Sequence, residues 1–537
     1  MGRMEWIRKI LPGRSSTSAS SPPYDDHLEC EEEYKQRWYS VRVIYFTMFL
    51  MSLGFSIILT GIWPYLNKLD SQAGKDFMGY IVGANPFGQM LFSPLFGYWS
   101  NKVTSIRIPL LISLAIFTTA SAVYSSIEIL PSHHKYWMLM SRFFVGVSSS
   151  NIAVCRSYLS AATRLKERTG AVAMVSLAQV LGFVVGPALQ AAVTQLGEHG
   201  FVIPGVFHLN MYTAAGWINV LLGILNFCMF LPTFFKERRI AAKEAMVMQG
   251  KEDEKDTWKS IKPDYFSAWT LIVAFFILVF NFVLLETLGT SLTMDQFAWS
   301  KMEALSYMGI LMSAGAVIAC VTFVAINPLC KRFDERKVLL WGGFFFMVLG
   351  RALYIPWGNE PPLIAEIGNG TSFNGTEIVG CPSTQEWCRT TPTMTISQFL
   401  LGYITTSIGY PIGVTLIQTI FSKVLGPRPQ GTWMGLMTGS GCLSRVMGPV
   451  FVGYIYTRLG TYWTFGVTTV MMAVAMVWLC LFNDRLVPPE VDTAATPVAV
   501  ELQEMSMVKL ASRESLDHMD DPELQALNGK SGKIEDR

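Results

Sequence analysis

The chain has 537 residues, of which 51% are hydrophobic and only 15% are charged. Soluble domains carry about 25% charged residues, so the composition predicts an all-α membrane protein with many spans. The net charge of +2 does not decide on a nucleic-acid partner, but no basic run is interleaved with aromatic residues, so we expect none. The nine cysteines lack metal-ligand spacing, and no phosphate-binding glycine loop or catalytic set occurs, so we expect neither an enzyme nor a cofactor.

Apolar segments long enough to cross a bilayer recur along the chain. The tails at 1–40 and 484–537 are polar, and we expect them to be disordered and cytosolic. A charged insert at 236–265 separates an N-terminal six-helix half (41–235) from a C-terminal six-helix half (266–483). The twelve predicted transmembrane helices are 41–63, 77–99, 107–129, 136–158, 169–194, 209–234, 266–292, 303–326, 338–357, 395–421, 431–457 and 463–483.

Lysine and arginine are unevenly shared between the two sets of loops. With the N-terminus in the cytosol, the cytosolic loops hold about three times as many as the opposite loops, and eight of them lie in the central insert. Positive charge marks the cytosolic side of a membrane protein. The sequence therefore predicts that both termini are cytosolic.

The loop at 358–394 falls on the opposite, lumenal side in this topology. It carries two glycosylation sequons, at Asn369 and Asn374, and a cysteine pair, Cys381 and Cys388. An oxidising compartment permits a disulfide between cysteines spaced in this way. We therefore expect a glycosylated lumenal loop with a possible disulfide.

One apolar segment type occurs once in each half. The first copy carries Gly182, Gly186 and Pro187, and the second, about 260 residues later, carries Gly448 and Pro449. Glycine permits close helix approach and proline bends a helix, so we expect a packing or hinge role. Twelve helices in two related halves indicate the major facilitator fold, in which the solute binds near the midplane between the halves.

Ionisable residues inside the spans are the main candidates for the transport pathway, because an intramembrane charge is costly unless it faces a cavity or a partner. Arg445 stands where the repeat has Phe183 in the other half, and an arginine there suits an anion. Ion pairing inside the bundle is the alternative for each charge, and helix packing for each polar residue. The pathway candidates are Arg142, Glu286, Arg445, Asn151 and Gln179.

Three other arginines are assigned structural positions. Arg42 and Arg156 fall near the cytosolic ends of their predicted spans, where they would fix the topology. Arg351 lies in the ninth span, which is peripheral in this fold, and we expect it to snorkel or pair.

Several stretches resemble known signatures. Residues 97–102 (GYWSNK) resemble the Gly-x-x-x-Asp-Arg pattern of major facilitators, with Asn101 in the acidic place. Residues 31–38 (EEEYKQRW), 62–66 (IWPYL), 380–388 (GCPSTQEWC) and 422–431 (SKVLGPRPQG) closely resemble the family of major facilitator superfamily domain-containing protein 8, or ceroid-lipofuscinosis neuronal protein 7. The resemblance implies a multi-pass endolysosomal membrane protein, and that family has been associated with chloride conductance.

Three functions follow from these patterns. The first is a carrier that moves a small, anionic solute across a lysosomal or late endosomal membrane, with the plasma membrane as the alternative location. The second is a passive chloride or anion channel on the same fold. The third is a non-transporting receptor or scaffold. In each case we expect a monomer whose partners are the lipid bilayer and a small molecule or anion.

Overall fold

The computed structural model describes residues 28–489 except 60, 71–72, 198–199, 204–206, 251–252, 255–256, 259–260, 359, 366–378 and 384. Nearly all of the described chain is helical. The elements of the N-terminal part are α1 (Glu31–Leu59), α2 (Ile62–Leu69), α3 (Gly74–Val103), α4 (Arg107–Ser125), α5 (His134–Ser149), α6 (Asn151–Ala161), α7 (Arg168–Val193), η2 (Thr194–Leu196), β1 (Phe201–Ile203), β2 (Phe207–Leu209) and α8 (Thr213–Met229).

The remaining elements begin with the linker helix α9 (Ala241–Gln249). They continue with α11 (Tyr265–Phe297), α12 (Lys301–Arg332), α13 (Glu335–Lys337), the π-helical η3 (Val338–Phe344), α14 (Phe345–Leu353), β3 (Ile364–Ala365), β4 (Cys381–Pro382), η4 (Glu386–Arg389), α15 (Ile396–Val424), α16 (Gly431–Leu481) and η5 (Asn483–Arg485).

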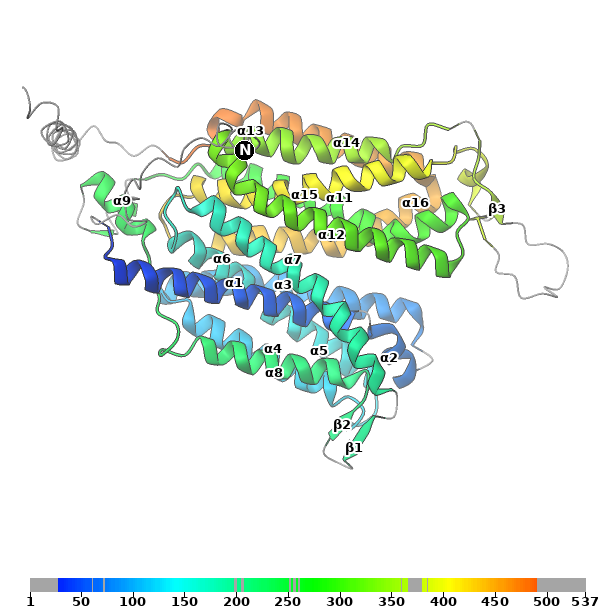
Figure 1. Cartoon of the computed structure of the whole chain (residues 1–537), viewed down its shortest axis with the longest axis horizontal. Coiled ribbons are helices and arrows are strands. Elements are labelled where there is room, and N and C mark those ends of the chain that lie inside the picture. The colour runs from blue at the N-terminus through cyan, green and yellow to red at the C-terminus, as the bar shows by residue number, and fades with distance from the viewer. Residues whose placement is uncertain are drawn as a thin grey trace, which may run out of the picture.

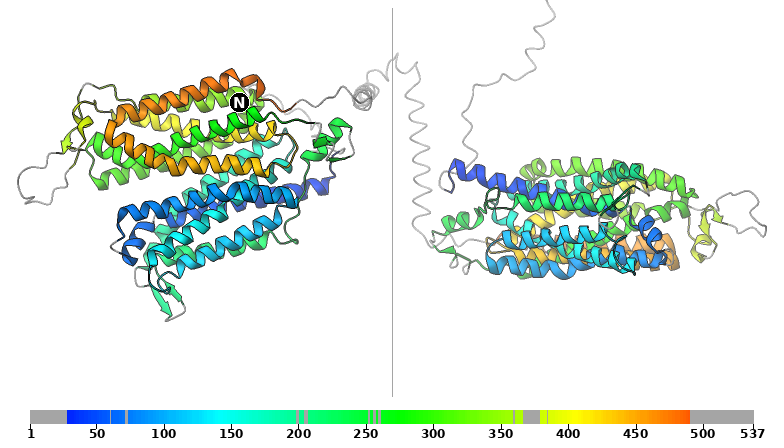
Figure 2. Two further views of the ribbon diagram at one scale, coloured as in Figure 1. Left: turned by 180° about the vertical axis from the view of Figure 1, so that it is seen from behind. Right: turned by 90° about the horizontal axis from the view of Figure 1, so that it is seen from below.

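The long helices form two bundles that lie side by side (Figure 1). The N-terminal bundle contains α1 to α8 and the C-terminal bundle contains α11 to α16, as the view from behind also shows (Figure 2). Helix α9 lies at one end of the bundles, which we call the linker end. Strand β3 lies at the opposite end, beside the loop that holds Cys381 and Cys388, and we call this the disulfide end.

Each of the twelve predicted spans corresponds to a helix or a continuous run of helical segments. Eight helices in the described part of the chain are long and apolar enough to cross a membrane, and the shorter apolar helix Thr213–Met229 joins them. The fourth span divides at Ser150 into α5 and α6, and the ninth contains η3 and α14. The last two spans form α16, which kinks at Gly460 (φ 82°, ψ −171°).

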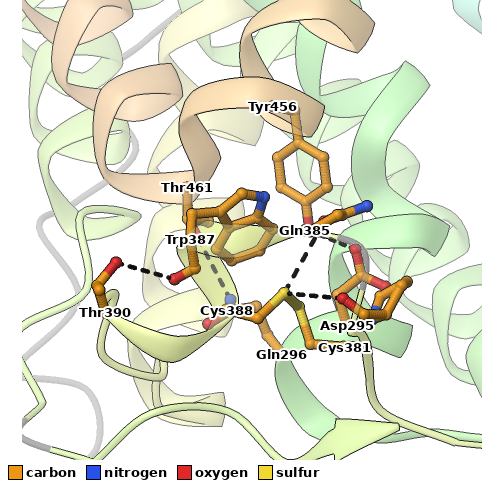
Figure 3. The surroundings of a disulfide bond; sticks show 10 residues. Asp295, Gln296, Cys381, Gln385, Trp387, Cys388, Thr390, Tyr456 and Thr461 are labelled. Carbon is orange, nitrogen blue, oxygen red and sulfur yellow. Dashed lines mark hydrogen bonds between the residues drawn. A yellow bond between two sulfur atoms is a disulfide. The ribbon is translucent and has the colours of Figure 1, made fainter. Parts of the chain in front are cut away.

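A tryptophan from the disulfide-end loop covers the kink in α16. Cys381 and Cys388 are joined by a disulfide, and Trp387 between them packs its buried ring against Tyr456, with 5.3 Å between ring centroids. The hydroxyl of Tyr456 donates to Asp295 of α11 over 2.9 Å (Figure 3). The loop therefore ties the end of α11 to the bend of α16.

The prediction that residues 31–40 belong to a disordered tail is wrong. Helix α1 begins at Glu31, and the guanidinium of Arg37 is buried between two carboxylates. It donates to Glu29 over 2.6 Å and to Glu167, in the loop between α6 and α7, over 2.9 Å. An acidic first turn also stabilises a helix N-terminus, so the charges that suggested a tail belong to an anchored helix start.

The central insert and the C-terminal tail also contain ordered parts. Helix α9 lies within the insert, where the carboxylate of Glu244 accepts a hydrogen bond from the amide of Leu165 over 3.2 Å. Burial raises the pKa of Glu244. In the tail, Leu486 is buried against the C-terminal core, so 484–489 is structured, while the rest of the tail lies outside the described residues.

The repeated glycine–proline pairs lie at corresponding contacts in the two bundles. A Cβ on Gly182 would lie 2.5 Å from the carbonyl oxygen of Phe49, so α7 packs directly on the backbone of α1. Gly186 meets Ser56 on the same helix. In the C-terminal bundle, a Cβ on Gly448 of α16 would lie 3.4 Å from the side chain of Val283 in α11. The glycines pack helices within each bundle, and a hinge role at Pro187 and Pro449 stays a prediction.

Candidate functional site

The two bundles meet backbone to backbone at the linker end. Gly97 of α3 and Gly431 of α16 approach so closely that a side chain on either would overlap the other's carbonyl oxygen. Asn101 fills the next turn, where its amide donates to the hydroxyl of Thr432 over 3.1 Å and its carbonyl accepts from the amide of Gly431 over 2.8 Å. Asparagine serves here because it both donates to and accepts from the partner bundle.

A buried arginine makes a second contact between the bundles. Arg168, at the start of α7, is 1% exposed and donates to the carbonyl oxygen of Ser422 in α15 over 3.2 Å. It also donates to the carbonyl of Ser160 over 2.8 Å, and the hydroxyls of Ser160 and Ser422 share a hydrogen bond of 2.7 Å. The guanidinium thus bridges the carbonyls of both bundles.

A third contact joins a carboxylate to partners on both sides. Glu335 accepts from Lys423 of α15 over 2.8 Å and from the hydroxyl of Thr169 in α7. Among the described residues, every hydrogen bond between the bundles lies at this end of the molecule. We call these contacts the linker-end seam: Gly97, Asn101, Ser160, Arg168 and Thr169 against Glu335, Ser422, Lys423, Gly431 and Thr432.

Further into the bundles, an arginine of each bundle comes within electrostatic range of the other. Arg156 of α6 donates to the side chain of Gln179 in α7 over 3.0 Å. Arg445 of α16 interacts with the hydroxyl of Tyr410 in α15 and lies close enough to Arg156 for the two charges to repel. In the described part of the chain neither arginine has an ion-pair partner, so the two positive charges concentrate at one place between the bundles.

Among the described residues, one carboxylate, that of Glu286, acts on Arg445. Glu286 of α11 is exposed and interacts electrostatically with Tyr410 and Arg445. The ring of Phe282, one turn earlier, stacks on Tyr410 with centroids 3.8 Å apart and planes 13° apart. Two guanidinium groups and one carboxylate leave net positive charge beside an aromatic surface. We call Arg156, Gln179, Glu286, Tyr410 and Arg445 the central cluster.

Two other pathway candidates lie elsewhere. Arg142 of α5 is fully buried inside the N-terminal bundle, with its guanidinium 5.4 Å from the ring centroid of Phe55. Its charge interacts with Tyr124 of α4, and its three nitrogens have no hydrogen-bond partner among the described residues. Asn151 is also fully buried, with both side-chain polar atoms unpartnered. The structure brings neither of them to the central cluster.

The structure corrects the assignment of Arg156 and decides between the two alternatives for Arg351. Arg156 is not an anchor at the end of its span, because α6 continues to Ala161 and the guanidinium donates to Gln179 of α7, within electrostatic range of Arg445 in the other bundle. Arg351 does not snorkel, because it is fully buried and donates to the carbonyl of Asn281 in α11 over 2.6 Å. Arg42 is exposed on α1.

The sequence also missed Tyr410, which interacts with Arg445 and electrostatically with Glu286. The only signal was a Tyr-Pro pair, Tyr410 and Pro411, inside an otherwise apolar span. The sequon residues Asn369 and Asn374 lie outside the described residues.

Comparisons with known proteins agree with this architecture. A model of the Major Facilitator Superfamily matches residues 44–374 and 378–515. The chain is 40% identical over 489 residues to major facilitator superfamily domain-containing protein 8 of Xenopus laevis, covering 86% of this chain and 95% of that protein. It is 26% identical over 457 residues to the class D tetracycline resistance protein of Salmonella ordonez, covering 82% and 95%.

Solved structures share the fold at low sequence identity. The human organic anion transporter MFSD10 (TETRAN) superposes with a TM-score of 0.57 at 17% identity, covering 82% of this chain and 99% of that one. A bacterial homologue of the iron transporter ferroportin in an outward-facing state gives 0.58 at 11% identity, covering 83% and 99%.

The chain therefore belongs to the Major Facilitator Superfamily of membrane transporters and, within it, to the family of major facilitator superfamily domain-containing protein 8. It is a multi-pass membrane protein with the all-α fold that the two repeated halves predicted.

Proposed function

We propose that this transporter carries a small organic anion, which binds at the central cluster between the two bundles. The observation that carries the proposal is that the positive charges of Arg156 in one bundle and Arg445 in the other repel each other. Neither arginine has an ion-pair partner among the described residues. Arginine stays ionised in a membrane, and two such charges close together are unfavourable until an anion neutralises them. A solute that contacts both bundles also gives a reason for them to move toward each other.

The linker-end seam supports a carrier rather than a channel. A passive pore needs both ends open at once, whereas the hydrogen bonds at Asn101, Arg168 and Glu335 close one end of this molecule. In alternating access one end closes while the other opens around a fixed midplane site. We therefore propose that the structure represents a carrier open toward the disulfide end.

We further propose that the linker end faces the cytosol and the disulfide end faces an endolysosomal lumen. The Lys and Arg of the insert support this orientation, and so does the disulfide between Cys381 and Cys388, which oxidising compartments favour. The family's resemblance supports the endolysosomal location. Replacing Asn369 and Asn374 with Gln should then remove a glycan and increase the protein's gel mobility.

Uptake into liposomes tests the anion carrier. Purified protein should take up labelled organic anions in a saturable manner that excess unlabelled anion on the far side stimulates. Arg445→Gln should abolish this uptake, while Arg458→Gln, a change at an exposed arginine on the same helix, should leave it intact. A steady conductance without saturation would favour the channel, and equal uptake by both variants would reject the anion site.

A further inference from the structure

A cavity lies at the linker end of the molecule, away from the central cluster. It has a volume of about 630 Å³ and reaches from Asn101 of the N-terminal bundle to Tyr265 and Trp433 of the C-terminal bundle. Trp258 of the linker and Arg428 of the loop between α15 and α16 complete its wall. The cavity therefore contacts both bundles beside the linker-end seam.

The aromatic residues around the cavity place it at the level of a membrane surface. Tyr265 begins α11, stacks on Trp433 with centroids 5.5 Å apart, and is 50% exposed. Trp269, one turn further along α11, contacts Trp433 edge to face at 5.9 Å and is 52% exposed. Exposed tyrosine and tryptophan at a helix end mark the headgroup level of a bilayer. The aromatic wall is thus within reach of lipid.

The polar groups of the cavity include two donors that no described residue accepts from. The indole nitrogen of Trp258 and the Nε of Arg428 are both buried, and neither has a hydrogen-bond partner among the described residues. A terminal nitrogen of Arg428 is already used, since it donates to the carbonyls of Ile261 over 2.6 Å and of Trp258. Buried donors without acceptors are costly, so an occupant of the cavity should supply acceptor oxygens.

We propose that this cavity binds one anionic phospholipid, with its phosphodiester at Trp258 and Arg428 and an acyl chain along Tyr265 and Trp433. Phosphate oxygens satisfy both unpartnered donors, and basic pockets between spanning helices are suited to lipid headgroups. The charged neighbours are Glu254 and Arg239, which line a smaller adjoining cavity with Arg428. Because a lipid here contacts both bundles, it stabilises the closed linker end.

Lipid-dependent stability tests the site without any transport assay. The full-length protein in detergent is unfolded by heat with added phosphatidylglycerol, phosphatidylcholine or glycerol 3-phosphate. Phosphatidylglycerol should raise the midpoint temperature most, because only it combines a net negative charge with acyl chains. Trp258→Phe removes one donor but keeps a ring in the wall, and Arg428→Gln removes the charge. Each should weaken phosphatidylglycerol binding about tenfold.

Trp269→Phe is the matched control, since Trp269 lies on the aromatic surface but not in the cavity wall, and its lipid shift should equal that of the unmodified protein. An equal shift in Trp258→Phe would overturn the proposal, even if Arg428→Gln does not fold. An equal shift with glycerol 3-phosphate alone would show a phosphate site rather than a lipid site. A shift that appears only after deletion of 490–537 would make that tail the occupant, and would also overturn it.

Discussion

Gly97 and Gly431 hold the two bundles in backbone contact, with no room for a side chain on either. Gly435, one turn along α16, repeats the contact, since a Cβ there would lie 2.4 Å from the carbonyl oxygen of Ser93. Ridges of small residues let helices approach closely, and here the approach joins α3 of one bundle to α16 of the other. The linker end is therefore closed by backbone surfaces as well as by side chains.

Gly97→Val should open the linker end. The added side chain must displace α16. Overpacking of this kind costs about 1–3 kcal/mol, and here it destabilises the closed state. A cysteine introduced at Thr432 should then react faster with a thiol reagent added from the linker side. Gly79→Val on the same helix is the control, because a Cβ at Gly79 meets nothing within 4 Å. Equal labelling in the two variants would contradict the closed contact.

Arg37→Met should destabilise the start of α1 strongly. The change leaves the carboxylates of Glu29 and Glu167 without their buried partner, and breaking a buried ion pair costs about 3–5 kcal/mol. Thermal unfolding in detergent measures the loss. Arg42→Met, at an exposed arginine of the same helix, should change the midpoint little.

The same cluster predicts a pH dependence of stability. Burial alone would raise the pKa of Glu167, but hydrogen bonds from Arg37 and Arg164 outweigh it and hold this pKa below its ordinary value of 4.5. A carboxylate with a lowered folded pKa contributes stability above its unfolded pKa and loses it as the pH falls through the folded pKa. The unfolding midpoint should therefore drop below about pH 4.5, and Glu167→Gln should flatten that part of the profile.

Gly460→Ala should destabilise the disulfide end. Gly460 has φ of 82° and lies against the ring of Trp387, so a Cβ there would be 2.6 Å from the ring. A non-glycine residue in this backbone region costs about 1–3 kcal/mol before the clash is counted. Gly466→Ala, in open space on the same helix, should be tolerated. The thermal unfolding midpoints of the two variants test this prediction. Equal midpoints would show that Trp387 does not support the kink.

Glu286→Gln should strengthen anion binding at the central cluster. Among the described residues, Glu286 is the carboxylate that acts on Arg445. Its removal increases the positive field there, so KM for an organic anion should fall several-fold while the fold is retained. A rise in KM would instead show that Glu286 positions Arg445 for the solute. Uptake into liposomes at several anion concentrations separates these outcomes.

The spans and the two-half fold could be predicted because apolar length and repeated Gly-Pro pairs are local properties of the chain. The ends of the spans could not be predicted in this way. Residues 31–40 were assigned to a tail because acidic residues favour both a helix start and a solvated tail. The same difficulty hid Arg156, since a shift of a few residues decides whether an arginine lies at a membrane surface or faces the other bundle.

The site was only partly visible for a different reason. Glu286 and Arg445 were found because charges are rare in apolar spans, and the structure does bring them together with Gln179 through Arg156. Arg142 carried the same signal yet lies within one bundle, beside Phe55. Sequence shows that a charge is buried, but the direction it faces depends on helix rotation, which packing at residues such as Gly182 sets.

The kind of hydrogen bonds in the linker-end seam determines how easily the linker end can open. Across the seam, Asn101 accepts from the amide of Gly431, Arg168 donates to the carbonyl of Ser422, and Ser160 and Ser422 bond hydroxyl to hydroxyl. Each of these groups can exchange its partner for a water molecule at little net cost, because a protein hydrogen bond is worth only about 0.5–1.5 kcal/mol beyond the water bonds it replaces. When the two bundles separate at the linker end, water should therefore replace these hydrogen bonds. The closed and open forms of the transporter then stay close in free energy, so the binding of one solute can shift the equilibrium between them.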